Sequence, residues 1–161
     1  MKFIPLPLKG AYLIELEPHC DERGSFSRTF CAKEFEAHQL VSQFVQMSTS
    51  FNHHRGQIRG MHYQEEPYAE TKIVRCIRGA IYDVMVDLRP NSETFNHWYG
   101  TKLSMENGKM FYIPKGFAHG YQTLTDNSEI FYMMDKDYVK ETAREIAPRD
   151  IYWQAAEEVN Q

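Results

Sequence analysis

Short segments rich in apolar, β-branched and aromatic residues recur along the chain from Phe44 onward, with turn residues between them. Such segments favour β-strands, and many short strands separated by turns are typical of a β-sandwich or barrel. The sequence therefore predicts an all-β fold with one or two short helices. The strands expected in this part of the chain are 44–48, 57–64, 72–78, 80–88, 97–105, 110–114, 120–124 and 129–135.

The first forty residues add short strands and turns, with an exposed strand expected over 25–30. Lys33, Glu34, Glu36 and Ala37 are good helix formers, so residues 32–40 are the best helix candidate. Because one glycine separates two of the strands, we expect 72–78 and 80–88 to pair as a hairpin that turns at Gly79. The polar tail from residue 155 is expected to be helical or frayed.

The totals exclude several classes of protein. The 161 residues suit one domain, 1–161, with a core of its own. A net charge of −4 offers no basic stripe for nucleic acid, and no apolar run reaches the roughly 20 residues that a membrane span needs. Three cysteines without a CxxC pair and an N-terminus without a signal-peptide pattern indicate reduced thiols in a cytoplasmic protein.

Two distant segments each bring one histidine into this β-rich sequence. The first spans Gly56-x5-His62 and continues to Lys72-x6-Gly79; the second reads Gly108-x5-Pro114-x-Gly116-x2-His119. The glycine and proline spacing resembles the paired motifs of the cupin superfamily, which implies a double-stranded β-helix, or jelly roll. Two of the usual metal ligands are replaced, by Gln64 and by Lys72, whose cation would repel a divalent metal. We therefore expect a metal-free site, since zinc or iron usually takes three protein ligands.

A narrower resemblance covers the chain from about Asp21 to Tyr138. The segments that carry it resemble the dTDP-4-dehydrorhamnose 3,5-epimerase family, which are metal-free and usually dimeric cupins. The resemblance implies an isomerase without a cofactor that inverts carbons beside the C4 ketone of a nucleotide-linked 4-keto-6-deoxysugar, most simply a dTDP sugar. It also implies a homodimer in which an N-terminal strand crosses to the other subunit. The matching segments are 59–64, 72–75, 83–89 and 113–120.

The resemblance also assigns roles to individual residues. His62 matches the base, Tyr132 the proton donor, and Lys72 is placed to hold the oxyanion of the enolate. These residue types suit the reaction, because a base that titrates near neutral pH must remove a weakly acidic proton while a cation stabilises the developing charge. His119 and Asp83 match a supporting pair, in which His119 is also expected to contact the substrate. The expected substrate contacts are Arg59 and Arg23 with the diphosphate, and Phe26, Gln46 and Tyr138 with the base.

The chain departs from the family in three places. Arg28 stands where the family usually has glutamate, and Gln46-Met47-Ser48 replaces Gln-Asp-Asn, so the nucleotide contacts at Arg28 and Ser48 differ. Typical members orient the base histidine with an aspartate in a longer C-terminal segment. No aspartate stands in that motif here, and Asp150 and Glu157 are the candidates to replace it. The sequence therefore leaves open a loss of activity, or single rather than double epimerisation.

Three further hypotheses stay open from the sequence. A nucleotide-sugar 3,4-ketoisomerase would use the same enolate with a different second proton transfer. A catalytically silent cupin would bind the nucleotide sugar for sensing or scaffolding, and the absent aspartate favours it. A metal-dependent cupin oxygenase is the least favoured, because two of its ligand positions are replaced.

Overall fold

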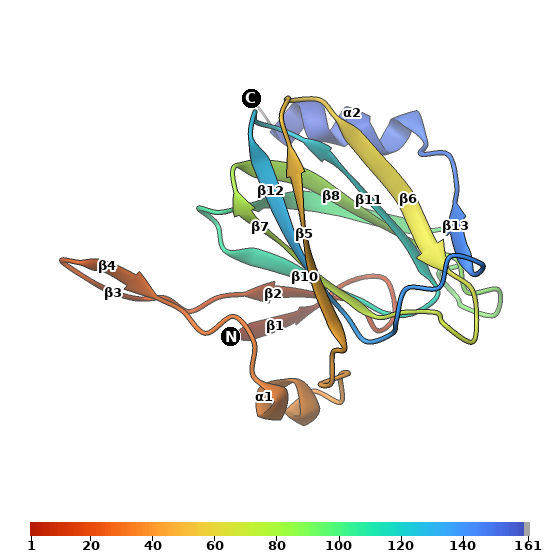
Figure 1. Cartoon of the computed structure of the whole chain (residues 1–161), viewed down its shortest axis with the longest axis horizontal. Coiled ribbons are helices and arrows are strands. Elements are labelled where there is room, and N and C mark those ends of the chain that lie inside the picture. The colour runs from red at the N-terminus through yellow and green to blue at the C-terminus, as the bar shows by residue number, and fades with distance from the viewer. Residues whose placement is uncertain (160–161) are drawn as a thin grey trace.

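Two antiparallel sheets face each other and enclose most of the core (Figure 1). The computed structural model describes residues 1–159, with the side chains of 154, 155 and 157–159 left outside the description. The first sheet has six strands in the order β1 (Lys2–Pro5), β2 (Tyr12–Glu15), β10 (Lys109–Ile113), β7 (Lys72–Arg78), β12 (Ser128–Met134) and β5 (Gln46–Asn52). The second has five, in the order β13 (Ala143–Glu145), β6 (Ile58–Gln64), β11 (Phe117–Thr123), β8 (Ala80–Asp87) and β9 (Trp98–Ser104). The expected all-β jelly roll is confirmed.

Side chains alternate between the two faces of each strand, which sorts the core into layers. In β8, Ile81 and Met85 point between the sheets, whereas Val84 and Val86 point outward. The outer face of the five-stranded sheet is covered by α2 (Asp150–Val159), which buries Tyr152 there. The outer face of the six-stranded sheet is covered by α1 (Ala32–Ala37) through Phe35. Among the described residues, no helix is long and apolar enough to cross a membrane.

The hairpin expected at Gly79 is wrong. β7 lies in the six-stranded sheet and β8 in the five-stranded sheet, so the chain changes sheets at this residue. One residue is too short for a hairpin loop, but Gly79 has a φ of 71°, and a Cβ there would collide with Thr125 and Ser128. Glycine therefore allows the sharp corner by which the strand leaves one sheet and enters the other.

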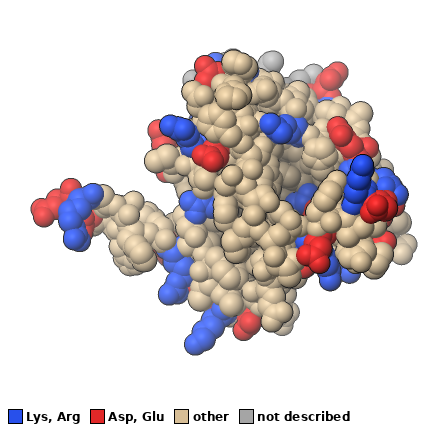
Figure 2. Space-filling model, in the orientation of Figure 1, with Lys and Arg blue, Asp and Glu red and all other residues tan. Residues whose placement is uncertain are grey.

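The other differences lie mainly at element ends. The helix expected over 32–40 ends at Ala37, and the strand expected over 25–30 is only the short β4 (Gly24–Phe26). β4 pairs with β3 (His19–Asp21) as a two-stranded hairpin that projects from the body of the molecule (Figure 1). Figure 2 shows charges of both signs at its tip, where Arg23 and Asp21 form an ion pair of 2.6 Å. The C-terminal helix begins at Asp150, before the expected tail.

A glycine-built irregularity between β6 and β11 aims two side chains in the same direction. His119 lies opposite His62, but Tyr121 lies opposite Arg59, so Gly60 and Met61 together face Gly120 alone. A Cβ on Gly60 would lie 2.5 Å from the His119 carbonyl oxygen, and one on Gly120 would lie 2.6 Å from that of Arg59. The extra residue of a β-bulge reverses the alternation. Arg59 and His62 therefore both face the space between the sheets, while Met61 is buried on the outer side.

Candidate active site

A cavity of about 190 Å³ lies between the two sheets, beside the β6–β11 bulge. Both sheets supply its walls. The five-stranded sheet contributes residues of β6 and β11, and the six-stranded sheet contributes residues of β5, β7 and β12. The lining residues are Ser50, Arg59, His62, Lys72, His119, Gly120, Tyr121 and Tyr132.

His62 is accessible at this cavity, with 56% of its side chain exposed. Its pKa lies below the ordinary value of 6.5, because partial burial disfavours the imidazolium and because the neighbouring cations Lys72 and Arg59 repel it. Glu145 opposes this shift. A histidine with a lowered pKa is mostly neutral at pH 7, and a neutral imidazole can accept a proton.

Lys72 is almost fully buried at the start of β7, and its Nζ lies 3.3 Å from Glu70 Oε1. Burial raises the pKa of Glu70, while the nearby Lys72 ammonium opposes the shift. This ion pair fixes a cation in the cavity wall. Such a fixed cation stabilises negative charge strongly, because it needs no reorganisation when the charge appears.

His119 and Asp83 form a fully buried pair behind the cavity. His119 Nε2 lies 2.8 and 2.9 Å from the two carboxylate oxygens of Asp83, which belongs to the neighbouring strand β8. Burial raises the pKa of Asp83, and the hydrogen bond from His119 opposes that shift. The carboxylate thereby fixes the orientation of the His119 ring, which also packs edge-on against Tyr132 at a centroid distance of 6.2 Å.

Tyr132 lines the cavity from β12, in the sheet opposite to that of His62. Burial raises its pKa well above the ordinary value, and the neighbouring Tyr121 phenol raises it further. Tyr132 therefore keeps its proton at neutral pH. An accessible base and a protonated phenol thus reach one cavity from two different sheets.

Six of the predicted substrate contacts lie outside the cavity. Arg23 and Phe26 stand on the projecting hairpin. The side chain of Arg23 is 85% exposed, and Phe26 as a whole residue is 75% exposed. Arg28 pairs with Glu34 at 3.1 Å. Gln46 and Ser48 stand at alternate positions of β5 before Ser50, so their side chains lie on the same face of the strand as Ser50 but farther along it, beyond the cavity. Tyr138 is exposed in the segment between β12 and β13.

Gln64 holds that last segment in place. Its Oε1 accepts a hydrogen bond of 2.8 Å from the backbone N–H of Val139, and its Nε2 donates to the carbonyl oxygens of Tyr68 and Asp137 at 3.0 and 3.1 Å. The amide thus has a structural task at a position where cupins usually have a metal ligand. Within the described part of the chain, His, Cys, Asp and Glu side chains do not gather in groups of three or more that could hold a metal ion.

Sequence reasoning missed Glu145, whose Oε2 lies 3.9 Å from His62 Nδ1. The short strand β13 pairs with β6 so that Glu145 is directly opposite His62, and reciprocal backbone hydrogen bonds between Met61 and Ile146 fix this register. Asp150 begins α2 on the outer face of the sheet, away from the face that carries His62. The side chain of Glu157 lies outside the described residues.

Ser50 and Tyr121 were missed as well, although the alternation of side chains could have found them. Ser50 follows Ser48 by two residues, and Tyr121 follows His119 by two residues, so each shares a face with a residue that was singled out. No comparable signal existed for Glu145, because its contact depends on a pairing between strands far apart in the chain.

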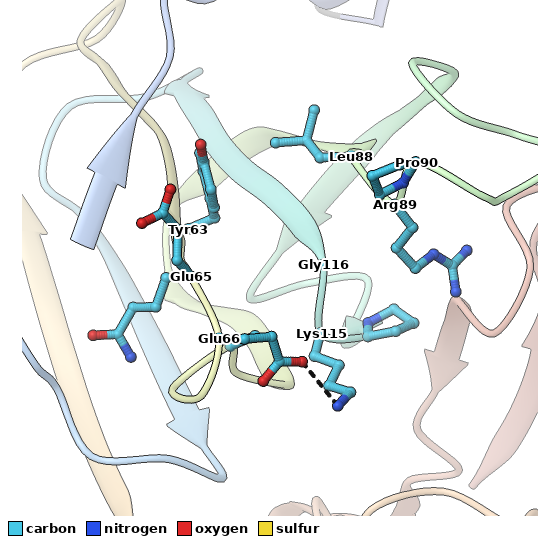
Figure 3. Close-up of a pocket in the computed structure, with 11 residues that line it drawn as sticks. Tyr63, Glu65, Glu66, Leu88, Arg89, Pro90, Lys115 and Gly116 are labelled. Carbon is cyan, nitrogen blue, oxygen red and sulfur yellow. Dashed lines mark hydrogen bonds and ion pairs between the residues drawn. The ribbon is translucent and has the colours of Figure 1, made fainter. Parts of the chain in front are cut away.

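A larger cavity, of about 610 Å³, lies elsewhere (Figure 3). Its walls include Tyr63, Leu88 and Pro90, and an ion pair of 3.0 Å joins Lys115 to Glu66 (dashed in Figure 3). None of the residues singled out as catalytic or substrate-binding lines it. The smaller cavity is the better candidate because a base, an acid and two cations converge there, and chemistry depends on such convergence more than on volume.

Comparisons with known proteins agree with the fold described above. The family model described as dTDP-4-dehydrorhamnose 3,5-epimerase matches residues 5–159. The dTDP-4-dehydrorhamnose 3,5-epimerase of Methanothermobacter thermautotrophicus is 45% identical over 137 residues, which are 85% of this chain and 73% of that protein.

Two solved structures are similar over most of their length. A dTDP-4-dehydrorhamnose 3,5-epimerase from Bacillus anthracis, with TDP and PPi bound, superimposes with a TM-score of 0.90 at 38% identity over 92% of this chain and 85% of that one. A dTDP-6-deoxy-D-glucose-3,5-epimerase from Legionella pneumophila, in complex with dTDP-4-keto-L-rhamnose, gives a TM-score of 0.87 at 34% identity over 99% and 81%.

Proposed function

The chain belongs to the dTDP-4-dehydrorhamnose 3,5-epimerase family, and we propose how its own residues carry out the reaction of that family. It is an isomerase that inverts C3, C5 or both in a nucleotide-linked 4-keto-6-deoxysugar. The observation that carries the assignment of residues is the convergence of His62, Lys72 and Tyr132 on one cavity from two facing sheets.

His62 removes the proton from the carbon beside the C4 ketone, and the electron pair of that C–H bond forms an enolate. The Lys72 ammonium faces the enolate oxygen and stabilises its charge. Tyr132 then gives its phenolic proton to the same carbon from the other side, which inverts the centre. The lowered pKa of His62 and the raised pKa of Tyr132 support these two roles. At pH 7 the imidazole of His62 is mostly unprotonated and can act as a base, whereas the phenol of Tyr132 keeps the proton that it donates.

Asp83 orients His119 in this scheme, and His119 in turn supports the substrate beside Tyr132. The buried pair needs no titration to do so, because the two hydrogen bonds of 2.8 and 2.9 Å fix the ring. The proposed chemistry uses no metal and no organic cofactor. We therefore expect full activity in buffer that contains EDTA.

The substrate is a nucleotide-diphosphate sugar, with dTDP as the preferred carrier. Arg59 faces the cavity and suits the diphosphate, because a guanidinium can bind two phosphate oxygens at once. We assign Gln46 and Ser48, which share one face of β5 with Ser50, to the nucleotide side, and the exposed ring of Tyr138 to stacking on the base.

The projecting hairpin supports the proposal of a homodimer. Arg23 and Phe26 stand on it, away from their own cavity, and an exposed phenylalanine on an arm of this kind suits contact with a second copy. We assign both residues, together with Arg28 at the base of the hairpin, to the nucleotide site of the neighbouring subunit. Residues 1–161 form one cupin domain in this proposal, in a cytoplasmic enzyme that works without nucleic-acid or membrane partners.

Glu145 takes the place of the aspartate that typical family members use to orient the base. Its carboxylate lies close enough to stabilise the His62 imidazolium, but 67% of the Glu145 side chain is exposed, so the interaction is screened by water. Exposed ion pairs contribute about 0.2–1 kcal/mol, and Glu145→Gln is therefore expected to lower kcat by a factor of up to about five.

The same substitution has a pH signature. The carboxylate raises the pKa of His62, so its loss lowers that pKa further, and the acid limb of the kcat/KM profile moves to lower pH. Glu145→Asp keeps the charge and is expected to keep the limb near its wild-type position. An unchanged limb in Glu145→Gln would show that Glu145 does not act on His62.

Tyr132→Phe separates the two halves of the reaction. We expect inversion to fall by about 10²-fold or more, because the acid is gone, while exchange of the sugar proton with D₂O continues from the His62 side. Proton NMR of dTDP-4-keto-6-deoxyglucose in D₂O measures both events. Tyr12→Phe, on the outer side of the six-stranded sheet, is the matched control and should leave both rates unchanged.

The same spectra decide between the remaining alternatives. Exchange at both C3 and C5 of the wild-type sample indicates a double epimerase, and exchange at one carbon indicates a single one. A product with the ketone moved to C3 would identify a 3,4-ketoisomerase instead. If no exchange occurred with dTDP-, GDP- or CDP-linked 4-keto sugars, the protein would be a silent binding protein.

A further inference from the structure

Tyr121 is a buried phenol in the cavity wall that the proposed reaction does not use. Only 2% of the residue is exposed. It lies on β11 two residues after His119, so both side chains point between the sheets. A buried hydroxyl needs hydrogen-bond partners, and those of Tyr121 lie across the barrel in the opposite sheet.

Two side chains of β5 contact the Tyr121 hydroxyl. Ser50 Oγ lies 3.0 Å from it, and Asn52 Nδ2 donates to its oxygen at 3.1 Å. Asn52 is almost completely buried and also accepts a hydrogen bond of 2.7 Å from Arg59 Nε, so its orientation is fixed from both sides. Ser50 is half-buried and lines the cavity, where its hydroxyl can exchange protons with water.

The other neighbour of Tyr121 is Tyr132. The two phenols share the cavity, and after burial itself the Tyr121 phenol is the next cause that raises the pKa of Tyr132. Both rings also pack against the ring of His119, Tyr121 at a centroid distance of 6.4 Å and Tyr132 at 6.2 Å. Tyr132 is thus held in its protonated form, and its phenolate, once formed in the reaction, is unstable in this surrounding and must be protonated again before the next turnover.

We infer that Tyr121 and Ser50 form the relay that returns a proton to Tyr132 after each inversion. The inference rests on the proposed function, in which Tyr132 is the acid. When Tyr132 has given its proton to the enolate carbon, the O–H bond of Tyr121 breaks and its proton forms a new O–H bond on Tyr132. Ser50 passes its own proton to the Tyr121 oxygen, and water in the cavity restores that of Ser50.

Charge balances over the cycle because His62 releases to the solvent the proton that it took from the sugar. Tyr121 acts only through Tyr132, so it is a positioning and relay residue rather than a group that touches the reacting carbon. Asn52 Nδ2 holds the Tyr121 oxygen in place without passing a proton.

Tyr121→Phe in the full-length protein tests the relay. With enzyme in excess over dTDP-4-keto-6-deoxyglucose, the first inversion is expected to stay within about twofold of wild type, because Tyr132 starts out protonated. With substrate in excess, steady-state kcat is expected to fall by about tenfold or more, with a larger solvent isotope effect. A structural role alone would slow both regimes together.

Two further variants keep the test decisive. Ser50→Ala removes the next link and is expected to show the same pattern, a preserved first turnover and a slower steady state. Tyr112→Phe removes another buried hydroxyl, which accepts a hydrogen bond of 3.0 Å from the Val41 N–H on the outer side of the sheet, and should leave both regimes unchanged.

The outcomes separate this inference from the function on which it rests. A steady-state rate in Tyr121→Phe equal to wild type, or an equal loss in both regimes, would overturn the relay while the wild-type enzyme still epimerises. A wild-type protein that inverts no centre would overturn the proposed function itself, and the relay with it.

Discussion

Replacing His62 with asparagine is expected to lower kcat by about 10³-fold, because a general base contributes roughly 10²–10⁴-fold to such proton transfers. Exchange of the C3 and C5 protons with D₂O should stop at the same time, since His62 is the proposed base that removes them. The variant should fold normally. His62 is more than half exposed and its nearest ionic partner, Glu145, is 3.9 Å away, so little stabilising contact is lost.

His53→Asn is the matched control for this experiment. His53 is exposed on the loop after β5, outside the cavity, and its replacement should change neither the rate nor the exchange. Proton NMR in D₂O measures exchange directly and does not depend on a coupled assay. Continued exchange in His62→Asn at the wild-type rate would contradict the assignment of the base.

Asp83→Ala is expected to have the largest effect on stability. Asp83 is completely buried, and its removal leaves the His119 N–H without its carboxylate partner in the interior. Breaking a buried pair from one side costs about 3 kcal/mol or more in the free energy of unfolding. Urea denaturation followed by the fluorescence of the two tryptophans measures this change.

Asp83→Asn provides the comparison. It keeps the size of the side chain and one oxygen that can accept from His119, so the loss of stability should be clearly smaller than in Asp83→Ala. It also removes the negative charge, and kcat should fall in both variants because the His119 ring is less well oriented. If Asp83→Ala unfolded at the wild-type urea concentration, the buried pair would have no structural importance.

The strands and much of the site were predictable from local sequence. Alternation of side chains and turn residues located most of β5 to β12. His62 falls within the strand expected over 57–64, whereas the strand expected over 120–124 begins one residue after His119. These features are local: each depends on the spacing of residues within one segment. The register of β6 with β11 places His62 and His119 opposite each other.

The features that failed depend on contacts between distant segments. In the sequence, the corner at Gly79 looks like a hairpin turn. That β7 and β8 belong to different sheets depends on how the two sheets pack against each other. The pairing of β13 with β6 brings Glu145 to His62, but β13 has only three residues, which is too short to show a periodic pattern in the sequence. The contact of Tyr121 with Ser50 and Asn52 crosses from one sheet to the other, so the sequence of neither strand predicts it.

The hydrogen bonds of Gln64 to the segment after β12 have a mechanical consequence. Gln64 follows His62 by two residues on the rigid strand β6, and its amide clasps the backbone at Asp137 and Val139 on both sides of Tyr138. The ring that is proposed to stack on the nucleotide base and the imidazole that is proposed to remove the sugar proton are therefore joined through Gln64 and β6. A shift of the clasped segment would reposition both ends of the substrate together. The distance between the bound nucleotide and the reacting sugar carbon would therefore stay constant.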